Sequence, residues 1–324
     1  PLPLPDELMV SVTPAELGHF LQQPTGLFYS ERLKIRILPT ESITLDEEPF
    51  ALDPLARAGI NRHLLKAALN AVQAGANAEA TIQDTLNRLC STGQLPPAPW
   101  DQLHAQTLAT DIQALASQWH HALDAWPEKS DMVEVDIPSL SKDVPFSVEG
   151  WLIGLHQNGN EKAQLMAYDG DIKDKPWRLI DAWVNHLCAN SQGLSLTSWM
   201  ISPDISYELP PLDETQAIDQ LRTIAQAWVD ALRAPLPLSP RTGFAFLNGK
   251  APSLSKARSA YDGSPQSIGE RDYDSNLMLR RSFPSFDALS RETDGDEIRF
   301  ARLARELYGP LLQLRKPLTL GGEA

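Results

Sequence analysis

The sequence predicts an α+β fold in which a helical subdomain is attached to a core that contains a sheet. Between residues 53 and 127 the apolar residues recur at helical spacing. From residue 128 onward, short stretches with strand-like alternation follow one another, and few helices separate them. Because consecutive strands argue against a doubly wound parallel sheet, they favour an α+β core.

Length and composition narrow the class of protein. The 324 residues contain 42% apolar side chains, which is enough for one large domain or two modest ones. No apolar run approaches the roughly 20 residues that span a bilayer, and the first residues lack the basic and apolar regions of a signal peptide. We therefore expect no membrane contact. Because the chain begins with Pro1 rather than Met, we also expect it to be a fragment of a longer protein.

Charge and cysteine content bear on compartment and partners. The formal net charge is −14, whereas a free-standing duplex-DNA binder normally carries a basic face. Cys90 and Cys188 lie far apart in the chain, which indicates a reducing compartment, and they are too few for an all-cysteine iron–sulfur cluster. We expect the chain to be cytoplasmic and to be monomeric when alone. We also expect it to bind DNA only weakly without partner proteins.

The first unit, residues 1–52, is predicted to hold two short helices and a basic strand. Thr13-Pro14 supplies an N-cap followed by proline at the first helical position, and a later proline separates the two helices. Arg32, Lys34 and Arg36 then alternate with apolar residues, and a period of two predicts a strand.

The second unit, residues 53–127, is predicted to be entirely helical. Its first helix ends near Gly75, its second follows the N-cap Asn77, and its third begins at Trp100 after a proline-rich break. The third helix keeps near-helical apolar spacing as far as Trp126.

The third unit, residues 128–324, is predicted to hold the sheet. We expect strands near 132–137, 144–156 and 162–169 as neighbours in one sheet, and Asn158-Gly159-Asn160 can close the hairpin between the last two. A following helix should bury a stripe of apolar residues on that sheet. The stripe consists of Ile180, Trp183, Val184 and Leu187.

The remainder of the third unit is predicted to be less regular in structure. Two strands, near 194–201 and 205–209, precede a helix that begins at Asp213. The segment from 239 to about 269 is turn-rich and is expected to be partly mobile, and a last helix is expected to stop at Gly309-Pro310.

Motifs of several common site classes are missing from the sequence. It contains no G-x-x-x-x-G-K-[ST], no G-x-G-x-x-G and no G-x-S-x-G. His120 and His121 are adjacent, so on a helix they diverge by about 100° and cannot ligate one ion together. His186 and Cys188 likewise face different ways on the predicted helix. We therefore expect structural roles for these residues, and no metal or cofactor.

Three stretches of the chain carry a family signature. Residues 17–65 hold a helix, a proline, an aromatic-rich helix and a basic strand, followed by Asp46-Glu47-Glu48-Pro49-Phe50. Residues 148–187 read VEGWLIGLHQNGN and, further on, WRLIDAWVNHL, and residues 254–281 include Lys256-Ala257-Arg258. Together these stretches resemble the C-terminal region of the RecC family, the gamma subunits of exodeoxyribonuclease V. The resemblance covers nearly the whole chain.

The resemblance implies a core like that of the PD-(D/E)xK, or restriction-endonuclease-like, nucleases without its active site. Active members read G-x-I-D, then a hairpin, then an apolar residue with D-Y-K. The two acids bind the metal that activates water, and the lysine stabilises charge on the phosphate. Here Ile153 and Ala167 replace the two acids, and Asp169 replaces the lysine. We expect no catalysis, and apolar packing between Ile153 and Ala167.

A second interpretation is an active metal-dependent DNA nuclease. Asp171 and Lys173 fit D-x-K, and Glu149 is an acid upstream of them. Against this interpretation, the D-x-K follows Gly170 in a polar turn beyond the apolar strand, and a three-letter match is common by chance. A third interpretation is an adaptor domain with no contact to nucleic acid.

The resemblance also implies a function and partners. It suggests a non-catalytic structural and DNA-guiding domain of a RecC subunit in the RecBCD complex, which acts in double-strand-break repair and homologous recombination. The implied partners are the RecB and RecD subunits and forked or end-containing DNA. The implied contribution is to duplex splitting and to docking of the RecD side.

Three basic residues are the candidate contacts to nucleic acid. Arg32, Lys34 and Arg36 would share one face of the predicted strand, where they could follow a phosphate backbone. The alternative is that they form ion pairs with nearby acids. Those acids are Glu41, Asp46, Glu47 and Glu48.

Overall fold

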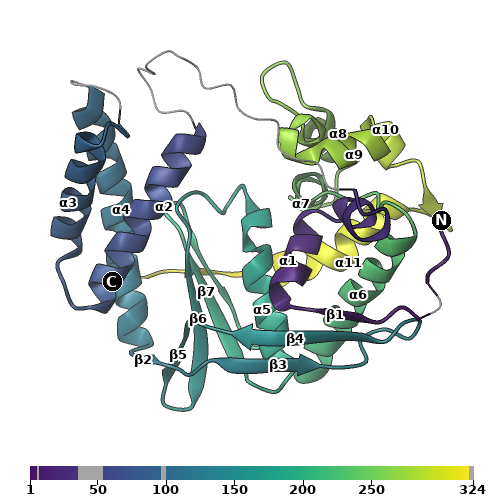
Figure 1. Ribbon diagram of the computed structural model, residues 1–324, viewed down its shortest axis with the longest axis horizontal. Helices are drawn as coiled ribbons and strands as arrows, with labels where there is room; N and C mark the ends of the chain where they lie inside the picture. The colour runs from purple at the N-terminus through teal and green to yellow at the C-terminus, as the bar shows by residue number, and fades with distance from the viewer. Residues whose placement is uncertain (6, 36–53, 96–99, 321–324) are drawn as a thin grey trace.

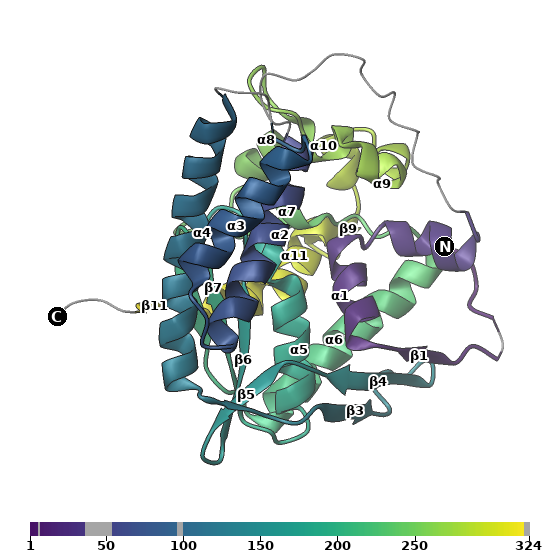
Figure 2. The same ribbon diagram turned by 60° about the vertical axis from the view of Figure 1, so that its left-hand side comes forward.

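The computed structural model describes residues 1–5, 7–35, 54–95 and 100–320. Figure 1 shows a six-stranded sheet between three helices on one side and a larger group of helices on the other, with a smaller sheet at the lower edge of the molecule. The same smaller sheet lies at the lower edge in Figure 2. Mixed sheets with helices around them agree with the predicted α+β class.

Three helices form the helical block that the sequence predicted. They are α2 (Pro54–Gln73), α3 (Ala78–Ser91) and α4 (Trp100–Ala125). Asn77 caps α3 as expected, because its Oδ1 accepts a hydrogen bond from Ala80 N at 3.0 Å. Ala163, Leu165 and Ile201 of the six-stranded sheet belong to the same hydrophobic core as this block. One face of the sheet therefore completes the core of the helical block.

The six-stranded sheet has the order β11-β8-β7-β6-β5-β2. Its β6–β7 ladder is parallel and its other ladders are antiparallel. The predicted hairpin is confirmed between β5 and β6, where Asn158 lies opposite Glu161 and Gly159 has a φ of 60°. The strands are β2 (Glu128–Lys129), β5 (Leu155–Asn158), β6 (Glu161–Ala167), β7 (Leu196–Ile201), β8 (Ser206–Leu209) and β11 (Lys316–Leu318).

The smaller sheet has three strands in the order β1-β4-β3. The prediction that the strands near 132–137, 144–156 and 162–169 share one sheet is therefore wrong. The expected strand 144–156 divides at Ile153-Gly154, where Gly154 has a φ of 70° that favours glycine, and the chain passes there into the other sheet. The strands are β1 (Val10–Val12), β3 (Val133–Ile137) and β4 (Phe146–Leu152), with β1 parallel to β4.

Helices cover the second face of the six-stranded sheet. A 3-10 turn, η2 (Pro176–Leu179), leads into α5 (Ile180–Asn190), which contacts β7. α1 (Pro14–Gln22) and α6 (Glu214–Arg233) both contact α5. The predicted stripe of α5 is confirmed, since its residues are at most 2% exposed. These are Ile180, Trp183, Val184 and Leu187.

The segment 239–269 does not have the irregular structure that its composition suggested. It contains α7 (Pro240–Leu247) and α8 (Leu254–Asp262). Ser253 acts as the N-cap of α8, so a residue type typical of turns serves a helix here. Phe244, Phe246 and Tyr261 of these helices are buried, which builds the segment into the main core.

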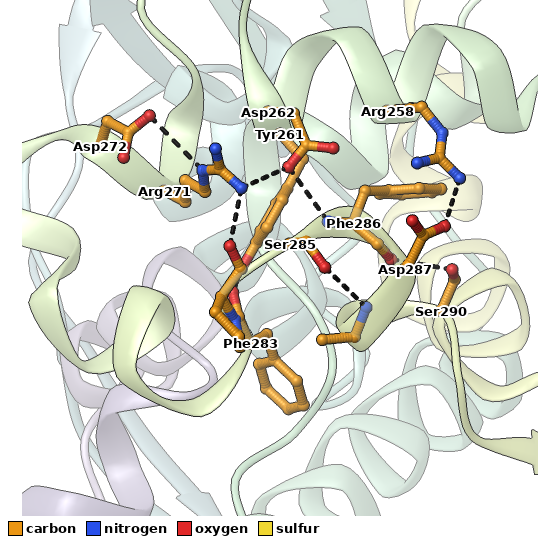
Figure 3. A network of polar contacts seen from close by, with 12 residues as sticks. Arg258, Tyr261, Asp262, Arg271, Asp272, Phe283, Ser285, Phe286, Asp287 and Ser290 are labelled. Carbon is orange, nitrogen blue, oxygen red and sulfur yellow. Dashed lines mark hydrogen bonds and ion pairs between the residues drawn. The ribbon is translucent and has the colours of Figure 1, made fainter.

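A network of polar contacts fastens the short elements that follow α8 (Figure 3). Asp262 Oδ1 accepts hydrogen bonds from Arg271 Nη1 at 2.7 Å and from Phe286 N at 3.1 Å. Arg271 Nη1 also donates to the carbonyl of Pro284 at 2.7 Å. The short elements are η3 (Glu270–Asp272), η4 (Asp274–Asn276), α9 (Leu277–Ser282), α10 (Phe286–Leu289), β9 (Thr293–Asp294) and β10 (Glu297–Ile298).

The last helix is longer than predicted. α11 (Arg299–Leu314) continues through Gly309-Pro310, where the sequence predicted a stop. Proline has no N–H to offer the carbonyl four residues earlier, that of Glu306. Gln220 Nε2 of α6 donates to this carbonyl at 2.8 Å instead. A side chain of a neighbouring helix therefore replaces the missing donor and lets α11 continue.

Candidate functional site

Two of the three positions assigned to the nuclease motif lie at the end of β6, and the third lies before β5. Ala167 is the last residue of β6 and is half-buried, and Asp169 follows two residues later. Ile153 lies in the link between β4 and β5 with 71% of its surface exposed. The expected apolar packing around Ile153 is therefore wrong, because the division of the sheets leaves this residue outside the core. The correspondence of the three residues to the motif stays a prediction.

Asp169 is neutralised by a partner from the next element. Arg178 of η2 donates from Nη2 to Asp169 Oδ1, and the side chains are 30% and 13% exposed, respectively. The Arg178 guanidinium also lies 6.0 Å from the centre of the Tyr168 ring. A Cβ at Gly170 would come within 2.8 Å of Arg178 Nη1, so the small residue lets the guanidinium approach. At the expected lysine position, the structure thus holds an internally paired carboxylate.

A second acid, Asp181, acts on the Tyr168 side of this pair. Asp181 of α5 accepts a hydrogen bond from Gln22 Nε2 of α1 at 3.0 Å. Burial raises the pKa of Asp181 and also that of Tyr168, and the nearby Asp181 raises the pKa of Tyr168 further. A Cβ at Gly18 would collide with the Asp181 carboxylate, so glycine allows α1 to approach α5. The Asp181 carboxylate thus has a hydrogen-bond donor from the neighbouring helix, which is typical of a structural group.

The residues of the alternative nuclease site are not brought together into a metal site. Glu149 lies on β4 of the three-stranded sheet, and Asp171 lies in the loop after β6 and forms a 3.7 Å ion pair with Lys175. Lys173 has its backbone N–H bound by the Asp204 carboxylate at 3.0 Å. Within the described residues, no group of three or more His, Cys, Asp or Glu side chains is placed to hold a metal.

Asp204 is a residue whose role the sequence analysis missed. Its two carboxylate oxygens accept the backbone N–H groups of Ile172 and Lys173 at 3.1 and 3.0 Å, which fixes the loop after β6. Burial raises the pKa of Asp204, but hydrogen bonds from Ser202 and from the two backbone groups outweigh it and hold the pKa below its ordinary value. The feature of the sequence that could have revealed this role is the Ser-x-Asp turn between two predicted strands.

The predicted basic strand is wrong. Arg32 ends a π-helical turn, η1 (Phe28–Arg32), and Lys34 has a φ of 55°, which is incompatible with a strand. Arg32 Nη2 donates to the carbonyl of Pro3 at 2.5 Å, and Lys34 pairs with Glu31 at 3.1 Å. The alternation of basic and apolar residues had suggested a strand, but the described residues of this stretch form a local turn instead. Arg36 and the acids Glu41, Asp46, Glu47 and Glu48 lie outside the described residues.

The histidine and cysteine residues have the surroundings expected of structural groups. His120 and His121 are exposed on α4. His186 is buried, and its Nδ1 lies 3.0 Å from Ser198 Oγ. Burial lowers the pKa of His186 to about 4 and raises the pKa of Cys188 to about 12. Both buried groups are therefore neutral at physiological pH.

Comparison with known proteins relates the chain to one family. A profile of the family described as RecC C-terminal domain matches residues 10–251. The chain is also similar to the RecBCD enzyme subunit RecC of Escherichia coli, at 25% identity over 315 residues that cover 94% of this chain. The chain spans only 24% of the length of that relative. In the part of the chain that the structure describes, no helix has both the length and the apolar character needed to cross a membrane.

Proposed function

Because the chain belongs to the RecC C-terminal domain family, we propose that it is a non-catalytic structural and DNA-guiding domain of a RecC-type subunit. The observation that carries the proposal is the family match over residues 10–251. In this role the domain contributes to duplex splitting and to docking of the RecD side. Its partners in the proposal are RecB, RecD and forked or end-containing DNA, in the cytoplasm.

The proposal includes a core of the PD-(D/E)xK type that has lost its active site. Two features support it: the β5–β6 hairpin leads into a parallel β6–β7 ladder, and α5 packs against that ladder. The chemistry of the motif positions supports it as well. Ile153 and Ala167 have no metal-binding atoms, and the carboxylate of Asp169 is held by Arg178.

The test of the non-catalytic role is a cleavage assay. The purified 324-residue chain is incubated with linear duplex and with single-stranded DNA in the presence of Mg²⁺ or Mn²⁺. We expect no degradation, because the motif positions lack their metal ligands. Degradation that disappeared in Asp171→Ala but persisted in Asp84→Ala, an exposed acid of α3, would overturn the proposal in favour of the active nuclease.

The DNA-guiding part of the proposal has its own test in the assembled complex. Arg32, Lys34 and Arg36 are replaced together by alanine in the full-length subunit, and fork binding is measured over a range of salt concentrations. If all three contact phosphates, the slope of log affinity against log salt should become shallower by up to about 3. An unchanged slope means that these residues serve ion pairs, such as the Lys34–Glu31 pair, and not DNA.

A further inference from the structure

The outer face of the three-stranded sheet combines acidic and apolar side chains. Successive residues of a strand point to opposite faces, and in this sheet one set is buried against the core while the other is exposed. The exposed set continues beyond the ladder into the residues that flank its end. We call this surface the acidic–apolar face, and it consists of Met132, Glu134, Asp136, Glu149, Trp151 and Ile153.

The acidic half of the acidic–apolar face contains an unfavourable pair of like charges. Asp136 of β3 lies directly opposite Glu149 of β4 in the antiparallel ladder. Like charges directly opposite each other across a ladder are destabilising. Glu149 accepts a hydrogen bond from Ser147 Oγ at 2.6 Å, which favours its ionised form. In the part of the chain that the structure describes, no ion pair involves Glu134, Asp136 or Glu149.

Its apolar half is unusually exposed. Trp151, which lies opposite Glu134, is 55% exposed. Met132 and Ile153, which flank the end of the ladder, are 63% and 71% exposed. Large apolar side chains that gather on one exposed surface next to charged groups are typical of an interaction site, and tryptophan is enriched among the residues that dominate binding energy.

The edge of this sheet also offers backbone groups. β3 is an edge strand, because β4 is its ladder partner and β1 lies on the far side of β4. An edge strand presents N–H and C=O groups to which an extended segment of another chain can add. Such a segment would lie beside the acidic–apolar face, with every second side chain directed over it.

We propose that β3 and the acidic–apolar face bind an extended segment of a protein partner that carries lysine or arginine two residues from an apolar side chain. A cation of the segment would lie between Asp136 and Glu149 and relieve their repulsion. Its apolar residue would cover Trp151. A phosphate backbone is disfavoured here, because the three carboxylates repel it. This inference does not depend on the proposed function, since the isolated chain suffices to test it.

The probe is a fluorescein-labelled ten-residue peptide with the repeat Lys-Thr-Val-Thr, which places lysine and valine two residues apart on one face of a strand. Its binding is measured by fluorescence anisotropy. Glu134→Lys/Asp136→Lys should weaken binding about tenfold or more, because it removes two attractive charges and adds two repulsive ones. Trp151→Ala should weaken binding about fivefold. Asp84→Lys/Asp111→Lys is the matched control, since it changes the net charge equally at exposed positions of α3 and α4, and binding should stay within about twofold.

Backbone hydrogen exchange locates the bound peptide. We expect slower exchange in Val133–Ile137 when the peptide is present, and a peptide with glutamate in place of lysine should give no protection. Equal weakening in the control variant, or protection elsewhere in the chain, would overturn the proposal. A duplex oligonucleotide that displaces the peptide would assign the face to DNA instead. A concentration-dependent dimer that Glu134→Lys/Asp136→Lys dissociates would assign it to a second copy of this chain.

Discussion

The two larger sheets of the molecule use polar side chains in opposite ways. The six-stranded sheet is covered on both faces, and the acids beside it serve the fold: Asp169 pairs with Arg178, and Asp204 binds two backbone N–H groups. The three-stranded sheet is covered on one face, and its exposed acids Asp136 and Glu149 face each other. The contacts of each acid thus indicate its role. An acid that is bound within the fold stabilises the fold, whereas an exposed acid that faces a like charge is available to a partner.

The largest expected effect compares two tryptophans. Trp183 of α5 is 2% exposed and Trp151 of β4 is 55% exposed. We expect Trp183→Ala to lower the free energy of unfolding by about 3–5 kcal/mol, because it leaves a cavity in the core. Trp151→Ala should change it by only about 0.5 kcal/mol. Urea denaturation of both variants measures the difference, and similar losses would remove the distinction between the two sheets.

A smaller effect is expected from the paired charges next to the six-stranded sheet. Arg178→Ala leaves the Asp169 carboxylate partly buried without its cation, and we expect a loss of about 2 kcal/mol, below the value for a fully buried pair. The control is Arg222→Ala, whose pair with Asp219 is exposed and should contribute less than about 0.5 kcal/mol. If thermal denaturation gave the two variants equal midpoints, Asp169 would have no special dependence on Arg178.

The third effect depends on pH. Asp204→Ala removes the acceptor of two backbone N–H groups, with an expected loss of about 1–2 kcal/mol at neutral pH. The folded-state pKa of Asp204 is lowered, so its stabilisation is present above the unfolded pKa of about 3.9 and is lost as pH falls through the folded pKa. The difference between variant and parent should therefore shrink on acidification. A difference that grew towards low pH would contradict the assigned role.

The smallest effect has the opposite sign. Asp136→Asn removes the like-charge pair with Glu149, and we expect the free chain to gain about 0.5 kcal/mol. Asp84→Asn on α3 is the control for a general gain from lowering the net negative charge. Calorimetry that found Asp136→Asn neutral or destabilising would mean that the acidic–apolar face carries no unfavourable energy to be relieved by a partner.

The three helices of the 53–127 block and the buried stripe of α5 could be predicted from the sequence because they depend on local patterns, whereas α7 and α8 were missed. Asn77 caps α3 as expected, and the stripe that includes Trp183 is buried. The division into two sheets could not be predicted, because Ile153-Gly154 joins two strand-like stretches and only tertiary pairing reveals which sheet each one enters. The continuation of α11 through Pro310 was equally hidden, since its compensating donor comes from Gln220 on another helix.

The candidate site was predicted only in part. The sequence showed that Ile153 and Ala167 lack metal-binding atoms, but it did not show that Ile153 is exposed. The sequence placed Asp169 at the lysine position of the motif. It did not reveal the pairing of Asp169 with Arg178, because that pairing depends on how η2 folds back towards β6. The strand predicted around Arg32 and Lys34 failed because alternation over a few residues is a weak signal beside a local turn.

The pairing of β1 with β4 has a consequence for the order of folding. The whole of α2, α3 and α4 lies between these two strands in the chain, so their parallel ladder closes a very long loop. Closing a loop costs conformational entropy that increases with its length, and compact helices shorten the distance that the chain must bridge. Early packing of the helices therefore favours the ladder, and β1 is expected to dock late. Destabilising the helical block should then slow the docking of an N-terminal strand that belongs to a different hydrophobic core.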